Sequence, residues 1–507
     1  MIEKYYDGAI EQVAAGLGTV EKNHLLVRYS GQFSVENLND TKQLEKNEDI
    51  FVQVHEFETG EITCAYEPYL TMICDGFRRY MTGTFEEFME TCDVYYLHRP
   101  VLLGYFNQDN TGREEIILLD EVAYEQERML AALERMLCAI ADRHPVLFVL
   151  NRFQLASKST MQLTARFLKC ENCNIGLVLG VSDVQAMPEF LVPDWEMLYE
   201  TLDDGSKIYH IGNSGRKKEE TIDDEKYVDY GSEKVYRKLQ NMVEFLDFDQ
   251  AAYYLETIER KIKFDNLLVD DAARFRMWLL FVKVSILRQD IPKALEICED
   301  LEKIHLAGKE EECAYEQDYL IATAYMYQGK LKEALEMAGE TYRIAGKMSD
   351  DYRMFLSELL EAKIQMSGWY NIFFCAQDVK IKESLIQNLI RYNYRNHLAH
   401  VYIYAYDNKP EIVKKANQSE ELLIYFSRGI RIAKKLGNEY LINMAYQKNI
   451  MLSSTNGMYE ISLLYSVRTY EALKDKRSIQ AGRIYSGIAY NLCAIGENER
   501  AMAYYRH

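Results

Sequence analysis

The chain has 507 residues, more than a single hydrophobic core usually serves, so at least two domains are expected. Its composition, 48% hydrophobic and 27% charged, is that of a globular protein. The formal net charge of −20 disfavours direct binding to nucleic acids and to anionic membranes, because both carry negative charge.

Apolar stretches rich in β-branched residues alternate with helical patterns in the first part of the chain. Five of these stretches predict strands, at residues 24–29, 50–54, 146–150, 175–180 and 207–212. A long pattern over 121–143 predicts a helix that leads into the third strand. Nearly all-apolar strands that alternate with helices predict an α/β fold, with a parallel sheet covered on both faces.

The third predicted strand, VLFVL, ends in an unexpected pair of residues. In nucleotide-hydrolysing domains, a strand of this shape typically ends in acidic residues that hold Mg²⁺ near the phosphates. Here its end carries Asn151 and Arg152, a neutral amide and a cation. The phosphate-binding sequence G-x-x-x-x-G-K-[ST] occurs nowhere in the chain.

A polar and charged stretch, GNSGRKKEETIDDEK, follows the last predicted strand. It has few apolar side chains to bury, which is typical of a domain boundary or an exposed loop. Beyond it the patterns are helical throughout. We therefore expect an α/β domain over residues 1–215, a charged linker over 216–230 and a helical domain over 231–507.

The helical part repeats with a period near 40 residues. Helix-breaking tripeptides recur at DFD (247–249), RQD (288–290), YQG (327–329), MSG (366–368), YDN (406–408), TNG (455–457) and AIG (494–496). Their last residues are separated by 41, 39, 39, 40, 49 and 39 residues, and the long step is attributed to an insertion near 416–423. This period predicts about seven stacked helical hairpins.

Small residues recur at fixed places around these breaks. Ala322 lies seven residues before Gly329 and Ala334 lies five after it, and the same spacing surrounds Gly496. With this pattern, residues 235–507 resemble the tetratricopeptide repeat in a form of about 40 residues. The resemblance implies an all-α superhelix that binds protein or peptide partners in its groove.

The stretch over 144–183 resembles the second nucleotide motif and following strand of the signal-transducing ATPases with numerous domains. Members of that family, such as the maltose-regulon type of transcription activator, commonly carry tetratricopeptide arrays behind the ATPase. The resemblance implies that the first domain is a P-loop ATPase by descent, and it implies a Mg²⁺ site at Asn151 and Arg152 that these residues cannot form.

The phosphate loop of that family would follow the first predicted strand. In this register its first glycine falls on Arg28, and its Lys-Ser/Thr pair falls on Ser34 and Val35. Ser34 has no positive charge to reach a phosphate. Because the phosphate and metal positions are all lost, we expect a degenerate domain that binds no nucleotide and no other cofactor.

Other candidate chemistry is sparse. Cys170 and Cys173 have CxxC spacing, and His397 and His400 can share a helical face, but neither pair has further metal ligands at a recognisable spacing. No nucleophile has a partner that the sequence identifies as a base. We therefore expect no metal site and no enzymatic activity.

Tyrosine is abundant, with 39 residues, and most fit the aromatic packing positions of the repeats. Tyr319, Tyr327 and Tyr490 fall at positions that usually face the groove of such arrays, so we expect them to contact a partner.

These features predict a regulatory or scaffold protein that binds a protein or peptide ligand. The alternative is the sensory part of a longer signalling protein, because the last residues, ERAMAYYRH, show no capping helix. A nucleotide cyclase or transcription-regulator output would then follow residue 507. The N-terminus lacks the features of a signal peptide, and the scattered cysteines favour a reduced compartment, so a cytoplasmic location is expected. The oligomeric state stays open.

Overall fold

The computed structural model describes residues 2–18, 24–29, 49–58, 61–109, 114–116, 119–170, 174–182, 187–203, 207–211, 230–265, 267–367, 382–407, 419–455, 457–472 and 479–506. The chain forms two compact units. Unit 1 comprises Met1–Arg113 and Val122–Leu320, and unit 2 comprises Glu114–Glu121 and Ile321–His507. The predicted linker lies outside the described residues except for residue 230. The units do not follow the predicted domains, because the first helices of the array group with the α/β part.

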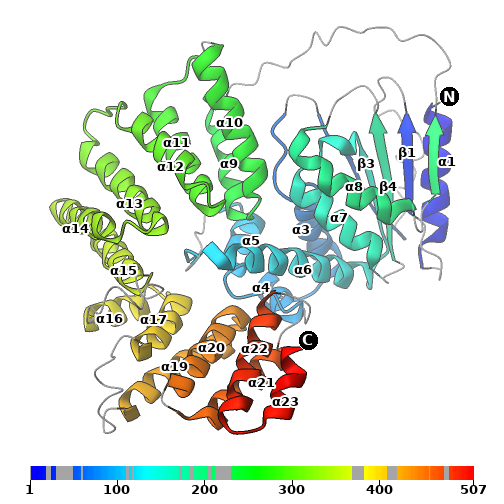
Figure 1. Cartoon of the computed structure of the whole chain (residues 1–507). Helices are drawn as coiled ribbons and strands as arrows, with labels where there is room; N and C mark the ends of the chain where they lie inside the picture. The colour runs from blue at the N-terminus through cyan, green and yellow to red at the C-terminus, as the bar shows by residue number, and fades with distance from the viewer. Residues whose placement is uncertain are drawn as a thin grey trace. The chain divides into compact units, whose positions relative to one another are not determined.

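Unit 1 contains the predicted parallel sheet (Figure 1). Its strands are β1 (His24–Tyr29), β2 (Phe51–Glu56), β3 (Val146–Asn151), β4 (Ile175–Ser182) and β5 (Lys207–Ile211). They lie in the order β2-β3-β4-β1-β5, and every neighbouring pair is parallel. The prediction of an α/β fold with a parallel sheet is therefore confirmed, and each strand overlaps a predicted stretch.

Helices cover both faces of this sheet. On one face, Ile10 and Val13 of α1 (Ile2–Gly16) pack against apolar side chains of β1, β3 and β4 (Figure 1). On the other face, Phe148 of β3 meets Tyr69 of α3 and Phe167 of α7, with ring centroids 4.7 and 6.4 Å away. Every residue of β3 and β4 is buried, because the sheet lies between these layers.

The remaining helices of the α/β part are α3 (Tyr69–Tyr80), α4 (Phe85–Thr91), α5 (Arg99–Asn107), α6 (Val122–Ala141), α7 (Lys158–Lys169) and α8 (Val192–Asp203). The predicted helix over 121–143 is α6. Among the described residues, no helix is long and apolar enough to cross a membrane.

The helices that follow form pairs, as the repeat period predicted (Figure 1). They are α9 (Glu233–Glu244) and α10 (Phe248–Phe264), α11 (Asp271–Leu287) and α12 (Ile291–Leu301), α13 (Glu310–Gln328) and α14 (Leu331–Lys347), α15 (Asp351–Ser367) and α16 (Glu383–Arg391), α17 (Arg395–Asp407) and α19 (Ser419–Leu436), α20 (Glu439–Thr455) and α21 (Tyr459–Ala472), and α22 (Ile479–Ala494) and α23 (Asn498–Tyr505). The chain is thus an α/β domain followed by an all-α array of tetratricopeptide type.

The predicted breaks fall at the junctions within these pairs, and one closing motif recurs there. A residue with positive φ follows the first helix, and the next N–H donates back to a carbonyl five residues earlier. Lys330 N lies 3.0 Å from Tyr325 O after Gly329, and Asp290 N lies 2.8 Å from Ser285 O after Gln289. This is the Schellman closure of a helix, which satisfies carbonyls that the helix leaves free.

Gln289 carries this motif at a cost, because its φ of 64° is unfavourable for a residue with a Cβ atom. Its side chain is exposed, so Gln289→Gly should relieve strain without loss of packing. We expect a stabilisation of about 1 kcal/mol, measured as a higher urea midpoint. Gly329→Ala, at φ 82°, is the matched control and should lower the midpoint by a similar amount. Equal midpoints for all three proteins would contradict this prediction.

In unit 2, the core between α15 and α20 is one apolar cluster. It includes Phe355 and Leu359 of α15, Leu389 of α16, Ile403 of α17 and Ala445 of α20. Such interlocking means that each pair of helices buries its apolar face against the next, as a repeat array requires.

Candidate functional site

At the carboxyl edge of the sheet, the ends of β1, β2 and β3 carry the residues at which the family resemblance implies a nucleotide site. Asn151, the last residue of β3, is fully buried, and its Oδ1 accepts a hydrogen bond of 2.7 Å from the hydroxyl of Tyr29 at the end of β1. Burial raises the pKa of Tyr29 to about 12, so this hydroxyl stays protonated and keeps donating at neutral pH. A neutral pair thus occupies the position between the two strand ends.

The neighbouring charges at this edge are also paired. Arg152 has a left-handed backbone, with φ 53°, and its guanidinium lies 3.3 Å from the carboxylate of Glu56 at the end of β2. The carboxylate of Glu56 is therefore held by a cation of the chain itself. This arrangement offers a Mg²⁺ ion a neutral amide and an arginine where carboxylates are needed.

The first half of the expected nucleotide site lies mostly outside the described residues. This holds for Ser34 and Val35, so their predicted role stays a prediction. Arg28 lies within β1, where it pairs with Val181 of β4 and His210 of β5. The position that the register gives to the first loop glycine thus lies within β1, which continues to Tyr29.

The N-terminus of α7, just after β3, is also occupied. Ser157 Oγ accepts from Thr160 N at 3.2 Å, and Asp247 Oδ2, at the start of α10, accepts from Ser159 N at 3.0 Å. The Gln250 side chain accepts from Lys158 N at 3.3 Å. The free N–H groups of a helix start attract anions, and here the first hairpin of the array supplies their acceptors.

Asp247 is buried in this contact, and burial raises its pKa above the ordinary value of 3.8, an effect that hydrogen bonds with Ser159 partly offset. The folded protein therefore holds this proton more tightly than the unfolded chain does. Stability from this group is gained as the pH falls below the folded pKa and is lost as the pH rises through it. We expect Asp247→Asn to raise the urea midpoint at pH 7, by a margin that shrinks toward pH 4. An equal margin at both pH values would contradict the prediction. Asp249→Asn is the contrasting variant: its carboxylate pairs with Lys158 and Arg288, so its loss should lower the midpoint at pH 7.

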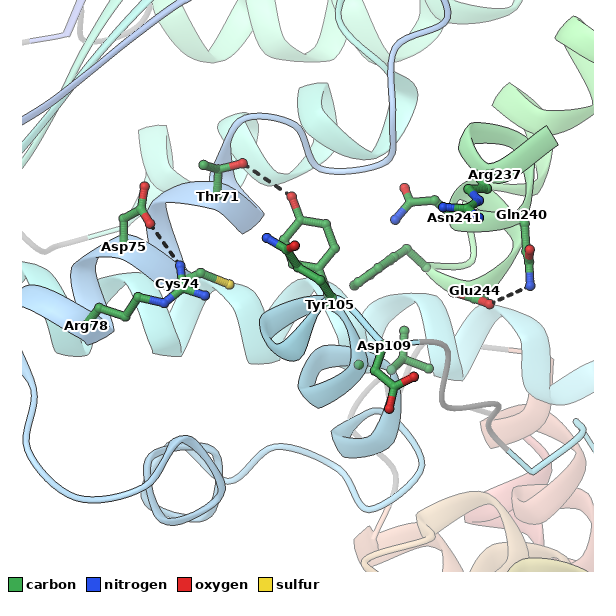
Figure 2. A pocket seen from close by; sticks show the side chains of 14 residues that line it. Thr71, Cys74, Asp75, Arg78, Tyr105, Asp109, Arg237, Gln240, Asn241 and Glu244 are labelled. Atoms are coloured by element: carbon green, nitrogen blue, oxygen red, sulfur yellow. Dashed lines mark hydrogen bonds and ion pairs between the residues drawn. The ribbon is translucent and has the colours of Figure 1, made fainter. Parts of the chain in front are cut away.

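Unit 1 also contains a cavity of about 510 Å³, lined by α3, α5 and α9 (Figure 2). The hydroxyl of Tyr105 lies 3.3 Å from that of Thr71, and the side chain of Asn241 points toward Tyr105 from α9. Among the described residues, the buried Oδ1 of Asn241 has no hydrogen-bond partner. The lining of the cavity is part polar and part apolar.

The Tyr105 hydroxyl and the Cys74 thiol of this cavity keep their protons at neutral pH. Burial raises the pKa of Tyr105 to about 12 and that of the Cys74 thiol to about 12. A thiol that keeps its proton is a poor nucleophile, and a phenol with such a pKa is a poor general base. Neither group gives the cavity catalytic chemistry.

The predicted partner tyrosines differ in their exposure. Tyr319 of α13 is 9% exposed and stacks on Tyr315, so it belongs to the packed interior. Tyr327, near the end of the same helix, is half-buried. Tyr490 of α22 is 52% exposed. Tyr319 and Tyr327 thus lie on one helix, α13, and Tyr490 lies on another, α22.

Of the cysteine and histidine pairs, Cys170 lies in unit 1, and His397 and His400 lie in unit 2. Cys173 lies outside the described residues, and the sulfur of Cys170 lies 3.6 Å from that of Cys138 on α6. His397 and His400 are buried at the start of α17. Among the described residues, no group of three or more His, Cys, Asp or Glu side chains could hold a metal ion.

A carboxylate that the sequence analysis did not single out meets His397. Glu114 lies in unit 2, after α5 in the chain, in a stretch over 114–116 that is neither helix nor strand. Its Oε1 accepts from His397 N at 2.8 Å and lies 2.6 Å from His397 Nδ1, and its Oε2 accepts from Asn396 N at 3.3 Å. The Glu114 side chain is only 6% exposed.

The local sequence explains why α17 needs this carboxylate. Tyr394 accepts the first helical N–H, from Leu398, and has no short side chain that can cap the helix. Its hydroxyl instead bonds to that of Tyr352 at 2.7 Å. Burial holds the pKa of His397 below its ordinary value, and the bond to Glu114 offsets this effect only in part. The imidazole is therefore neutral and donates from Nδ1 to Glu114, which acts as the missing cap.

The next two residues of this stretch contact α15. Lys363 Nζ lies 3.5 Å from Glu115 Oε2 and donates to Ile116 O at 3.4 Å. The Lys363 side chain is 8% exposed and that of Glu115 is 31% exposed. Two helices of the array, α15 and α17, thus hold two adjacent carboxylates and a backbone carbonyl. We call these contacts the acidic-segment site.

This site connects to the following helix pair through buried amides. Asn438 Nδ2 donates to Asn396 Oδ1 at 3.1 Å, and Asn438 Oδ1 accepts from Leu441 N at the start of α20. Both asparagines are buried. The carboxylate of Glu114 and the start of α20 therefore share one polar network.

No family model and no curated protein sequence matches the chain. Solved structures with a similar course include NprR in complex with its cognate peptide NprX, at 15% identity and a TM-score of 0.38, covering 55% of this chain and 77% of that one. The apo quorum sensor NprR from B. thuringiensis matches at 15% identity and a TM-score of 0.39, covering 53% of this chain and 72% of that one. A signal transduction ATPase with numerous domains and a tetratricopeptide repeat sensor, from Pyrococcus horikoshii, matches at 10% identity and a TM-score of 0.43. The match covers 96% of this chain and 86% of that one. These values are too low to transfer a ligand or an activity.

Proposed function

We propose that this chain is a non-enzymatic regulatory protein that binds a peptide, or an extended protein segment, on its array of helical hairpins. One observation carries the proposal: α15 and α17 already hold a non-helical stretch of the chain through its carboxylates and a carbonyl. A surface that recognises backbone and side chains of an irregular segment in this way has the chemistry to bind a peptide. The proposal rests on these contacts and not on the distant likeness to NprR.

The polar inventory of the array favours binding over catalysis. His397 is neutral and fully occupied at Nδ1 by Glu114, and Lys363 is paired with Glu115. The contacts are those of recognition: an ion pair, backbone amides and a carbonyl.

We further propose that the α/β part no longer binds ATP. The neutral pair of Tyr29 and Asn151 and the ion pair of Arg152 and Glu56 support this, together with the missing phosphate-loop sequence. Isothermal titration of the full chain with Mg-ATP up to millimolar concentration should give no heat of binding. Binding in the micromolar range would contradict this part of the proposal.

The peptide-binding proposal is tested with a display library of random peptides on the immobilised full chain. We expect a set of peptides to be enriched, and their binding to weaken when Lys363 is replaced by Met, which keeps the length of the side chain without its charge. Tyr327→Ala and Tyr490→Ala show whether the predicted tyrosines take part. If no peptide is enriched over an unrelated helical protein, the proposal is wrong.

A further inference from the structure

We infer that the ligand of this array is a peptide with two adjacent carboxylates, which binds in the acidic-segment site in place of Glu114 and Glu115. This inference rests on the proposed function, which it deepens by naming the chemistry of the ligand. The chain's own segment then competes with the ligand and keeps the site closed in its absence.

The Glu114 position selects for a carboxylate. Both of its oxygens are used, one by the amide and imidazole of His397 and the other by the amide of Asn396. These amides lie at the positive end of the α17 dipole, which favours an anion over a neutral acceptor. A ligand with a neutral residue here would leave buried donors without a charged acceptor.

The Glu115 position adds a second selection, from a different helix. Lys363 of α15 is nearly buried, and a buried ammonium requires an anionic or strongly polar partner. It has two: the carboxylate of Glu115 and the carbonyl of Ile116. Because α17 binds one carboxylate and α15 binds the next, the site is selective for two adjacent acidic residues followed by a backbone carbonyl.

The segment has the properties of a replaceable occupant. Residues 114–116 belong to no helix or strand, and as whole residues they are partly buried, although the Glu114 side chain is only 6% exposed. The donors that hold the segment belong to α15 and α17 and are almost fully buried themselves. Net charge does not provide the attraction, because the chain carries −20 overall and the site is a local exception.

Binding at this site would also affect the hydrogen-bond network to α20 and the chain's own segment over residues 114–116. The network through Asn396 and Asn438 connects the first turn of α17 with the first turn of α20. A ligand that replaces Glu114 takes over the same amides and keeps this network intact, while the chain's own segment is set free. Release of the segment, and not a rearrangement of the helices, is therefore the expected signal.

The test uses a fluorescent nonapeptide with the sequence of residues 113–121, Arg-Glu-Glu-Ile-Ile-Leu-Leu-Asp-Glu, titrated into the full chain. We expect the E114A/E115A variant to bind it at least about tenfold more tightly than the wild type, because the internal competitor is gone. Adding Lys363→Met to that variant should weaken binding by about tenfold or more. A control nonapeptide with glutamine in place of Glu114 and Glu115 should bind no better than a scrambled one.

If E114A/E115A does not fold, E114Q/E115Q takes its place, since the amide oxygens can still accept hydrogen bonds; folding is checked by circular dichroism. Equal binding to wild type and variant, or binding that ignores Lys363→Met, would overturn the inference. Enrichment of library peptides without adjacent acids would also overturn it, while leaving the proposed function intact. Only the absence of any enriched peptide would count against both.

Discussion

Replacing Glu114 with alanine is expected to lower the free energy of unfolding of the array by about 2–4 kcal/mol, because three buried donors at the start of α17 lose their charged acceptor. Water cannot easily replace the carboxylate, since His397 and Asn396 are each about 1% exposed or less. Urea unfolding followed by circular dichroism measures the change.

Two matched variants separate the carboxylate from general effects of the segment. Glu114→Gln keeps an oxygen acceptor without the charge, so its loss should be about half as large. Glu115→Ala removes a partly exposed partner of Lys363 and should cost about 1 kcal/mol. If Glu114→Ala and Glu115→Ala had the same small effect, the carboxylate cap at α17 would not be a major contact.

Asn151→Asp is the second variant with a large expected effect. The substitution places a carboxylate at a position with no exposed surface, beside the Tyr29 hydroxyl. We expect the free energy of unfolding at pH 7 to fall by about 2–3 kcal/mol. The introduced carboxyl would bind its proton more tightly in the folded state, so the loss should shrink as the pH is lowered.

In a site that binds Mg²⁺, the same aspartate would supply a carboxylate ligand and favour metal binding. Mg-ATP binding and turnover are therefore measured beside stability, and neither should appear in Asn151→Asp. Asn151→Leu is the control for the lost hydrogen bond alone, with an expected cost of about 1 kcal/mol. A stable Asn151→Asp protein that binds Mg-ATP would show that the sheet edge has kept its nucleotide chemistry.

The sheet and the helix pairs could be predicted because their signals are local. Apolar runs such as VLFVL mark buried strands, and the breaks at Gly329 and Gly496 mark helix ends whose backbone favours glycine. The same local pattern could not foresee that Gln289 adopts the same conformation, since nothing in its side chain signals a positive φ.

The acidic-segment site could not be predicted, because its parts are distant in the chain. Glu114 and His397 are separated by 283 residues, and nothing near either one indicates the other. The sequence around His397 and His400 contains no carboxylate at a recognisable spacing, so it does not indicate a site there. One sign was available in hindsight: α17 starts after Tyr394, without a residue that can cap it.

The tyrosines show a different limit. A helical period places Tyr319 and Tyr490 on comparable faces of their helices, yet the first is 9% exposed and the second 52%. Which positions of a repeat stay exposed depends on the side chains of neighbouring helices as well as on contacts within the helix, such as that of Tyr319 with Tyr315 of the same α13. The spacing of residues alone cannot supply that information.

Hydrogen exchange of the wild-type chain, with and without the unlabelled nonapeptide, tests the central claim most directly. The account predicts faster exchange in residues 114–116 when the peptide is present, while the amides of Asn396 and His397 stay protected because the peptide takes over their bonds. Unchanged exchange in residues 114–116 at a saturating peptide concentration, or loss of protection at both α17 amides, would contradict it.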